Sequence, residues 1–242
     1  SQFEQAPIGL DHWQSQVNRF GLGAPLGIDL PNEKSGLMPG SKYYNRLYGA
    51  KRWKFSNLTS VSIGQGEVLM TPIQMANLAA IMANRGYYYR PHLVKSIGES
   101  NYQDPKYLER IETGIKSEHF PVIIQGMADV LRGTAGRAVI KDIEVCGKTG
   151  TVENGKGEDH SVFMAFAPKD DPQIAIAVYV ENAGQGGRAA ASISSLLMET
   201  YIKGAHTRQW LEDYVMKGDF GDRKRTVTTL PEVELDLTDE GQ

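Results

Sequence analysis

The run Gly147-Lys148-Thr149-Gly150-Thr151 is the part of the sequence best suited to chemistry. It places one cation beside two hydroxyl groups, and its glycines leave room for a bound molecule to approach the backbone. Lysine supplies a fixed positive charge, and threonine hydroxyls are short hydrogen-bonding groups. Such a set suits either phosphate binding or acyl transfer at a carbonyl group.

The phosphate-binding interpretation fails on spacing. A phosphate loop has a glycine five residues before the glycine of Gly-Lys-Thr, where the backbone must turn, and here that position is Asp142. The flanking residues also continue a strand pattern instead of changing to a loop and a helix. We therefore favour acyl transfer, in which an extended peptide can lie along a strand edge and pair with its backbone.

Three short strands are predicted around this run, at residues 143–152, 160–167 and 174–181. Gly-rich and Asp/Pro-containing turns join them, which favours an antiparallel meander. The segment from 174 to 180 is almost wholly apolar, as is typical of a strand covered on both faces. We therefore expect helices to pack on the sheet.

Four helices are predicted, at residues 11–20, 71–85, 120–131 and 189–202, whereas residues 21–54 are expected to be rich in loops. The second helix has the best-specified start, because Thr71 can cap it, Pro72 suits its first position and Gln74 completes a capping box. The residues expected to face the core are Met75, Leu78, Ala79 and Met82 in the second helix, Val122, Ile123, Met127, Val130 and Leu131 in the third, and Ile193, Leu196, Leu197 and Tyr201 in the fourth.

Composition limits the partners. The net charge of −3 over 242 residues gives no general basic field, so nucleic acid is not an expected partner. Cys146 is the only cysteine, and neither a disulfide framework nor a metal or other cofactor is expected. No stretch has the roughly 18 uninterrupted apolar residues of a membrane span. Residues 219–242 are charged and poor in large apolar residues, which predicts a mobile tail after one domain at 1–218.

Several short blocks resemble the class B penicillin-binding proteins and follow that family's order over most of residues 8–203. They are Phe20-Gly21-Leu22-Gly23, Leu26-Gly27-Ile28-Asp29-Leu30-Pro31, Ser62-Ile63-Gly64-Gln65-Gly66, Thr71-Pro72-Ile73-Gln74-Met75-Ala76, Arg132-Gly133-Thr134-Ala135, Asp159-His160-Ser161-Val162-Phe163 and Phe166-Ala167-Pro168. On these blocks the sequence is identified as a member of the family, and it is most similar to the elongation-type penicillin-binding protein 2. The lysine run then resembles the Lys-Thr-Gly element of serine acyl-transfer enzymes.

The resemblance implies an α/β fold of the α+β type, the penicillin-binding/serine β-lactamase-like fold, in which helices flank an antiparallel sheet. Two further strands of that sheet are missing from this sequence, so we expect an incomplete sheet with an exposed strand edge. The implied activity is a D,D-transpeptidase that crosslinks peptidoglycan stem peptides. Lys148 would support proton movement, Thr149 and Thr151 would hold a carboxylate, Gly150 would give the substrate room, and the backbone N–H of Thr151 would form half of an oxyanion hole.

The family also needs Ser-x-x-Lys, which carries the serine nucleophile, and Ser-x-Asn, and neither occurs in this sequence. We expect both in a longer parent protein that is anchored in the inner membrane, with this domain in the periplasm. The expected partners of that parent are stem peptides, β-lactams and a glycosyltransferase. The isolated chain is expected not to acylate.

Some alternatives remain open. A buried inert thiol is favoured for Cys146, a hydrogen-bonded structural role for His160, and a solvated loop position for Arg188; the last two could also support the site. At the level of function, a serine β-lactamase or antibiotic sensor shares Lys-Thr-Gly. A non-catalytic domain that binds peptidoglycan or a partner would keep the fold without the serine.

Overall fold

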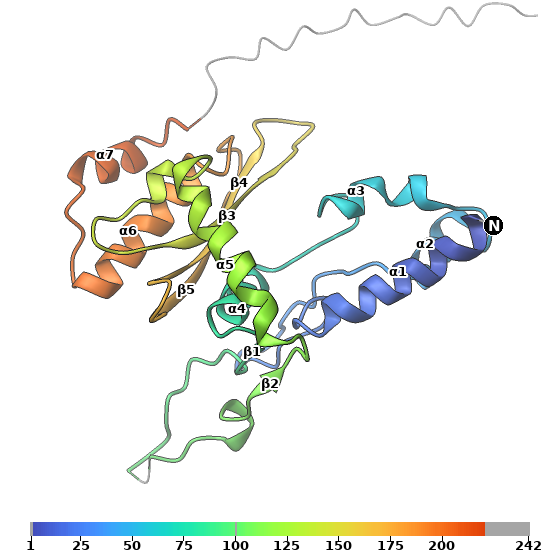
Figure 1. Ribbon diagram of the computed structural model, residues 1–242, viewed down its shortest axis with the longest axis horizontal. Coiled ribbons are helices and arrows are strands. Elements are labelled where there is room, and N and C mark those ends of the chain that lie inside the picture. Colours follow the sequence, from blue (N-terminus) through green and yellow to red (C-terminus); the bar gives the residue numbers. More distant parts are fainter. Residues whose placement is uncertain (1, 100, 221–242) are drawn as a thin grey trace, which may run out of the picture.

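The computed structural model describes residues 2–99 and 101–220, and its centre is an antiparallel sheet (Figure 1). Three strands pair successively, in the order β3 (Cys146–Val152), β4 (His160–Ala167) and β5 (Ile174–Val180). The predicted meander is therefore confirmed. Within the described residues β3 and β5 form the two edges of this sheet, so an added strand could pair with either.

Helices cover both faces of the sheet, as its apolar strands predict. Along β4 the side chains alternate: Phe163 and Ala165 lie in one core with α6 (Ala189–Lys203), whereas Phe166 lies in another with α4 (Pro72–Ala83) and α5 (Phe120–Asp129). Strand β5 packs against both α4 and α6. The observed α+β arrangement is the expected fold class.

The face that α6 turns towards the sheet differs from the predicted one. Small residues form it, with Ala190, Ala191 and Ser194 all fully buried. Of the predicted core residues, Leu196 is buried, but Leu197 and Tyr201 are 50% and 65% exposed. Small side chains allow the helix to lie close against the sheet, and close packing outweighs the burial of larger side chains on the other face.

Helix α4 begins as the sequence predicts. Thr71 accepts a hydrogen bond from the N–H of Gln74, and the Gln74 side chain accepts one from the N–H of Thr71, which completes the capping box. The helix ends two residues earlier than expected, at Ala83. Its most buried residues include Gln74, Asn77 and Ile81, and of the predicted stripe only Ala79 is fully buried.

The N-terminal third of the chain forms an extension beside the sheet (Figure 1). It contains α1 (Gln2–Asn18), α2 (Ser41–Tyr48) and α3 (Thr59–Ser62), so the first helix is longer than predicted and α2 lies in a region expected to be loop. The two carboxylate oxygens of Asp11 accept hydrogen bonds from the backbone N–H and the hydroxyl of Ser41, each at 2.7 Å, and so join α1 to α2. A separate small core holds the extension together; it consists of Ala6, Leu10, Tyr44, Trp53 and Val61.

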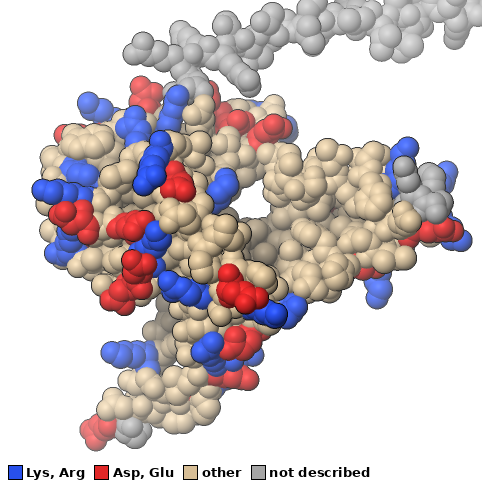
Figure 2. All heavy atoms as spheres, in the orientation of Figure 1, with Lys and Arg blue, Asp and Glu red and all other residues tan. Residues whose placement is uncertain are grey.

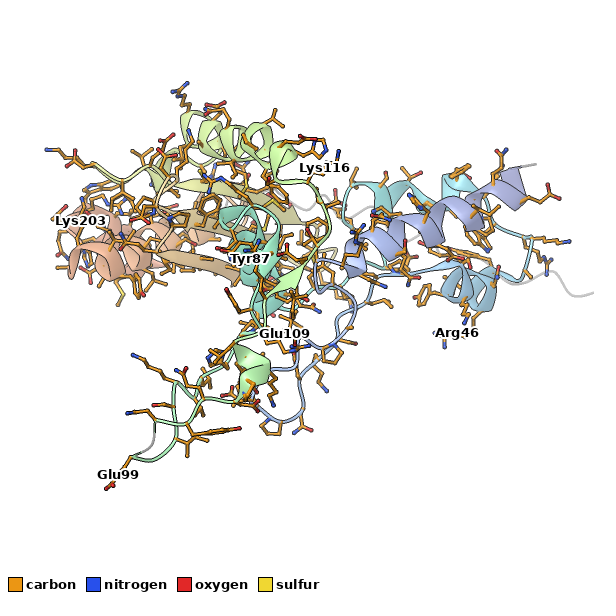
Figure 3. All side chains as sticks on the ribbon, turned by 60° about the horizontal axis from the view of Figure 1, so that its bottom comes forward. Arg46, Tyr87, Glu99, Glu109, Lys116 and Lys203 are labelled. Atoms are coloured by element: carbon orange, nitrogen blue, oxygen red, sulfur yellow. The ribbon has the colours of Figure 1, made fainter. Side chains whose placement is uncertain are left out.

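A second projection leaves the body at the short strands β1 (Tyr87–Tyr88) and β2 (Ile111–Glu112), which pair antiparallel. Figure 3 shows Glu99 at its tip and Arg46 on the N-terminal extension, pointing away from the body in different directions. The two projections therefore leave the body separately.

Two predictions near the C-terminal half need correction or completion. In α5 the predicted core residue Met127 is buried, but Val122 and Ile123 are 71% and 52% exposed, because Phe120 and Ile124 face the core in their place. A further helix that was not predicted, α7 (Gln209–Lys217), follows α6. The predicted tail lies outside the described residues from 221 onward.

Candidate active site

Strand β3 carries the residues of the lysine run on an edge of the sheet. Thr149 pairs opposite Phe163, which packs against α6, so the side chains of Thr149 and Thr151 lie on the α6 face of the sheet. Lys148 and Gly150 lie on the opposite face. All the predicted residues thus lie on the same edge strand, but the side chain of the lysine and those of the threonines project from opposite faces of the sheet.

A cleft of about 730 Å³ opens at this edge, and we call it the β3 cleft. In Figure 2 a hollow is visible between the rounded body, which holds the sheet, and the extension. Burial, followed by the neighbouring carboxylate of Glu181, raises the pKa of Tyr179, which lines the cleft. The lining residues come from β3, from β4 and the end of β5, and from the segment before α4 together with the first turn of that helix. They are Lys148 to Val152, Val162, Tyr179, Glu181, Ile63, Gly64, Gln65, Val68, Leu69, Met70, Pro72 and Met75.

Both threonine hydroxyls of β3 have a hydrogen-bond partner from another segment. The hydroxyl oxygen of Thr149 lies 3.1 Å from that of Thr134, in the turn that follows α5. The hydroxyl oxygen of Thr151 accepts a hydrogen bond of 3.3 Å from the N–H of Gly186, in the loop before α6. Both side chains are therefore positioned before any ligand binds.

The backbone of β3 faces the cleft at alternate residues. The Lys148 ammonium group donates to the carbonyl oxygen of Thr149 at 2.5 Å, and the Gln65 amide donates to that of Thr151 at 3.5 Å. In an antiparallel pair, the N–H and C=O groups of one residue point towards the same side. The N–H of Thr151 therefore also points to the open edge, where an oxyanion could accept a hydrogen bond from it.

The other residues singled out in the sequence make structural contacts. Burial raises the pKa of the Cys146 thiol to about 12, so this fully buried thiol stays protonated at neutral pH. Nδ1 of His160 accepts a hydrogen bond of 3.0 Å from the N–H of Asn182. Arg188 lies at the start of α6, where its guanidinium donates to the carbonyl oxygen of Phe220 at 3.5 Å. None of these contacts joins His160 or Arg188 to the lysine run.

Three contributors to the edge had no assigned role in the sequence: Gln65, Thr134 and Gly186. Gln65 and Thr134 lie within blocks that carry the family resemblance, which is the one signal that pointed towards them. Their contacts with β3 join segments that are 86, 15 and 35 residues apart in the chain, a separation that no local pattern encodes.

Residues 2–99 and 101–220 contain no group of three or more His, Cys, Asp or Glu side chains placed to hold a metal ion. In the same ranges no helix is both long and apolar enough to cross a bilayer.

The chain is similar to several characterised proteins. A peptidoglycan D,D-transpeptidase MrdA of Acinetobacter baumannii is 34% identical over 205 residues, which are 76% of this chain and 30% of the relative. The structure of PBP2 from Pseudomonas aeruginosa in complex with WCK 5153 has 31% sequence identity and a TM-score of 0.71, over 86% of this chain and 46% of that one. An imipenem acyl-enzyme complex of penicillin-binding protein A from M. tuberculosis has 26% identity and a TM-score of 0.63, over 79% and 42% of the two chains.

These matches cover only part of each relative, so the chain spans about a third of the length of the curated relatives. The penicillin-binding protein 2 subtype expected from the sequence is the one named in the P. aeruginosa match. The family model described as the penicillin binding protein transpeptidase domain matches residues 1–199. With the sheet, the edge strand and its lysine run in place, the chain belongs to the penicillin-binding protein transpeptidase family.

Proposed function

We propose that this chain forms the substrate-facing wall of a peptidoglycan D,D-transpeptidase. The observation that carries the proposal is the open edge of β3 in the β3 cleft, where Thr149 and Thr151 have oriented hydroxyls and the Thr151 N–H points outward. An extended D-alanyl peptide could pair with this edge as an added strand. The serine nucleophile would come from protein outside these 242 residues.

The reaction is an acyl transfer in two steps. The serine oxygen attacks the penultimate D-alanine carbonyl, the amide C–N bond breaks, and the terminal D-alanine leaves with a proton on its nitrogen. An amine from a neighbouring peptidoglycan strand then attacks the acyl-serine ester, which forms the crosslinking amide and returns the proton to the serine oxygen. A β-lactam carbonyl would enter the first step in the same way.

Each residue of the edge has a separate task in this proposal. Lys148 supplies positive charge beside the nucleophile and assists proton movement, and the hydroxyls of Thr149 and Thr151 bind the substrate carboxylate. The Thr151 N–H stabilises the oxyanion, an effect of about 3 kcal/mol for one such donor. Gly150 leaves the space that the substrate backbone needs. His160 and Arg188 support the surrounding turns, each through the backbone hydrogen bond described above.

The biological setting is part of the proposal. The parent protein would act in wall elongation, anchored in the inner membrane with this domain in the periplasm, and would work beside a glycosyltransferase. The names of the matched relatives support the enzyme class: the A. baumannii protein is a peptidoglycan D,D-transpeptidase, and the M. tuberculosis protein forms an acyl-enzyme with imipenem. Neither nucleic acid nor a cofactor has a place in this chemistry.

The test is to label the natural full-length protein and the isolated 242-residue chain in parallel with fluorescent penicillin. We expect a long-lived label on the full-length protein and none on the isolated chain. In the full-length protein Lys148→Ala should slow labelling by roughly 10²–10⁴-fold, the range of general acid–base contributions. Labelling of the isolated chain would refute the claim that the nucleophile lies outside these 242 residues. Rapid loss of the label would favour a β-lactamase. A full-length protein that takes up no label would favour a non-catalytic binding domain.

A further inference from the structure

The two hydroxyls of β3 differ in what their partners allow. Gly186 offers Thr151 an N–H group, which can only donate, so the Thr151 oxygen must accept and its own hydrogen stays free for a ligand. Thr134 offers Thr149 a hydroxyl, which can either donate or accept. When Thr134 donates, the Thr149 hydrogen is also free, and both hydrogens can then bind one carboxylate.

The Gly186 loop lies unusually close to β3 and to Thr134. A Cβ atom on Gly186 would lie 2.2 Å from the carbonyl oxygen of Gly150, and one on Gly187 would lie 1.9 Å from the carbonyl oxygen of Thr134. No side chain fits at either distance. The glycine pair thus lets one loop contact both the strand and the turn that supports it.

The segment that directly follows Thr134 is held by Arg208. Arg208 donates to the carbonyl oxygen of Val139 at 2.9 Å and to that of Arg137 at 3.5 Å, and it is anchored in turn by Glu199 at 2.8 Å. The Thr134 side chain itself is exposed, beside the cleft-lining Thr149. With its backbone held in place and its hydroxyl exposed, Thr134 is suited to orient the hydroxyl of the neighbouring Thr149.

We propose that Thr134 is a positioning residue for carboxylate recognition: it donates its hydroxyl hydrogen to Thr149 and thereby turns the Thr149 hydrogen towards the substrate carboxylate. The inference rests on the proposed function and deepens it, since it concerns how the same site recognises the D-alanyl or β-lactam carboxylate. Thr134 would act on binding of the ligand, whereas the bond-forming step would depend on Lys148 and the serine.

Acylation kinetics of the natural full-length protein with fluorescent benzylpenicillin can separate these two effects. Thr134→Val keeps the side-chain shape and removes the hydroxyl, and it should raise the dissociation constant of the initial complex by roughly three- to tenfold. The maximal acylation rate should change less than twofold. Thr134→Ser, which restores a hydroxyl, should bind within twofold of the wild type. Thr200→Val on the exposed side of α6 is the matched control.

A double-mutant cycle with Thr149→Val distinguishes two roles for Thr134: orienting the Thr149 hydroxyl, or only packing against its neighbours. If Thr134 acts through Thr149, then Thr134→Val should have almost no further effect once the Thr149 hydroxyl is absent. Equal losses in Thr134→Val and Thr134→Ser, or additive losses in the cycle, would overturn the inference while wild-type labelling upholds the proposed function. If Thr134→Val lowers the melting temperature by more than about 5 °C, Thr134→Ala replaces it in the test, with the same expected change in the dissociation constant. An unlabelled wild type would overturn both proposals.

Discussion

Two polar clusters of this protein, one on β3 and one centred on α6, contain similar groups but differ in how far they are buried. The β3 cluster lies at the cleft edge, where its side chains are exposed or half-buried; it consists of Lys148, Thr149, Thr151 and Thr134. The Glu199 cluster joins α6 to the segment that follows it, with the Glu199 side chain 1% exposed; it consists of Glu199, Arg208, Ser195, Thr207 and Lys203.

The difference between the clusters concerns what happens when a partner is lost. A buried carboxylate without its cation keeps the full cost of its lost hydration, so the Glu199 cluster resists rearrangement. An exposed hydroxyl exchanges its partner for water at little cost, so the β3 cluster can accept a ligand. The Glu199 cluster is therefore suited to stability, and the β3 cluster to ligand binding.

The largest expected effect comes from Glu199→Ala, which leaves the Arg208 guanidinium, 14% exposed, without its carboxylate. We expect the free energy of unfolding to fall by about 3–5 kcal/mol, as measured by urea unfolding of the full-length protein. Glu118→Gln is the control, because this carboxylate forms ion pairs while 67% exposed; it should change stability by less than about 1 kcal/mol. If both substitutions lowered the free energy of unfolding equally, burial would not set the Glu199 cluster apart from exposed polar groups.

A second prediction concerns Cys146, which lies on β3 but points into the buried core. With its pKa raised to about 12 by burial, the thiol should react with iodoacetamide at pH 8 at least roughly 100-fold more slowly in the folded protein than in urea. The rate of alkylation, followed by mass spectrometry, checks this. Rapid alkylation of the folded protein would mean that the strand edge opens far more than its core contacts allow.

The third prediction is the pH dependence of the Glu199 cluster. Burial raises the pKa of Glu199, but hydrogen bonds and charge from Arg208, with help from Thr207 and Lys203, outweigh it and hold the pKa below the ordinary 4.5. A lowered pKa stabilises the fold at pH values above 4.5, and this contribution disappears as pH falls through the folded-state pKa. The stability difference between the wild type and Glu199→Gln should therefore shrink below pH 4.5. A difference that stays constant down to pH 3 would contradict the ion pair.

The smallest effect is expected at the cleft. Thr149→Val and Gln65→Ala each remove an exposed or half-buried hydrogen bond, at 3.1 and 3.5 Å. Each should change the free energy of unfolding by less than about 0.5 kcal/mol. A loss above 2 kcal/mol in either variant would show that the β3 cluster is structural after all.

The sequence predicts those parts of the fold that depend on local patterns. All three strands of the sheet and the capping box at Thr71 and Gln74 follow from turn residues, apolar runs and cap chemistry. The lysine run is also placed correctly, on a strand that forms an edge. These features need no knowledge of distant segments.

Helix faces could not be predicted in the same way. In α6 the larger apolar residues Leu197 and Tyr201 are exposed, and in α5 so are Val122 and Ile123. Which side of a helix meets the sheet depends on how closely the two can approach, and small residues such as Ala190 decide that. The Thr134–Thr149 contact could not be predicted for a related reason, since the turn that carries Thr134 packs against the Gly186 loop from a distant part of the chain.

The capping residue Gln74 has a consequence for the mechanics of the cleft. Its side-chain nitrogen donates to the carbonyl oxygens of Ala24 and Ser35, each at 2.9 Å, in the segment that joins α1 to α2, and the whole residue is buried. One wall of the β3 cleft is the segment between that extension and α4, and the other belongs to the sheet. Gln74 therefore ties the start of α4, which lines the cleft, to the N-terminal extension, so a single buried amide group links the cleft to a distant part of the fold.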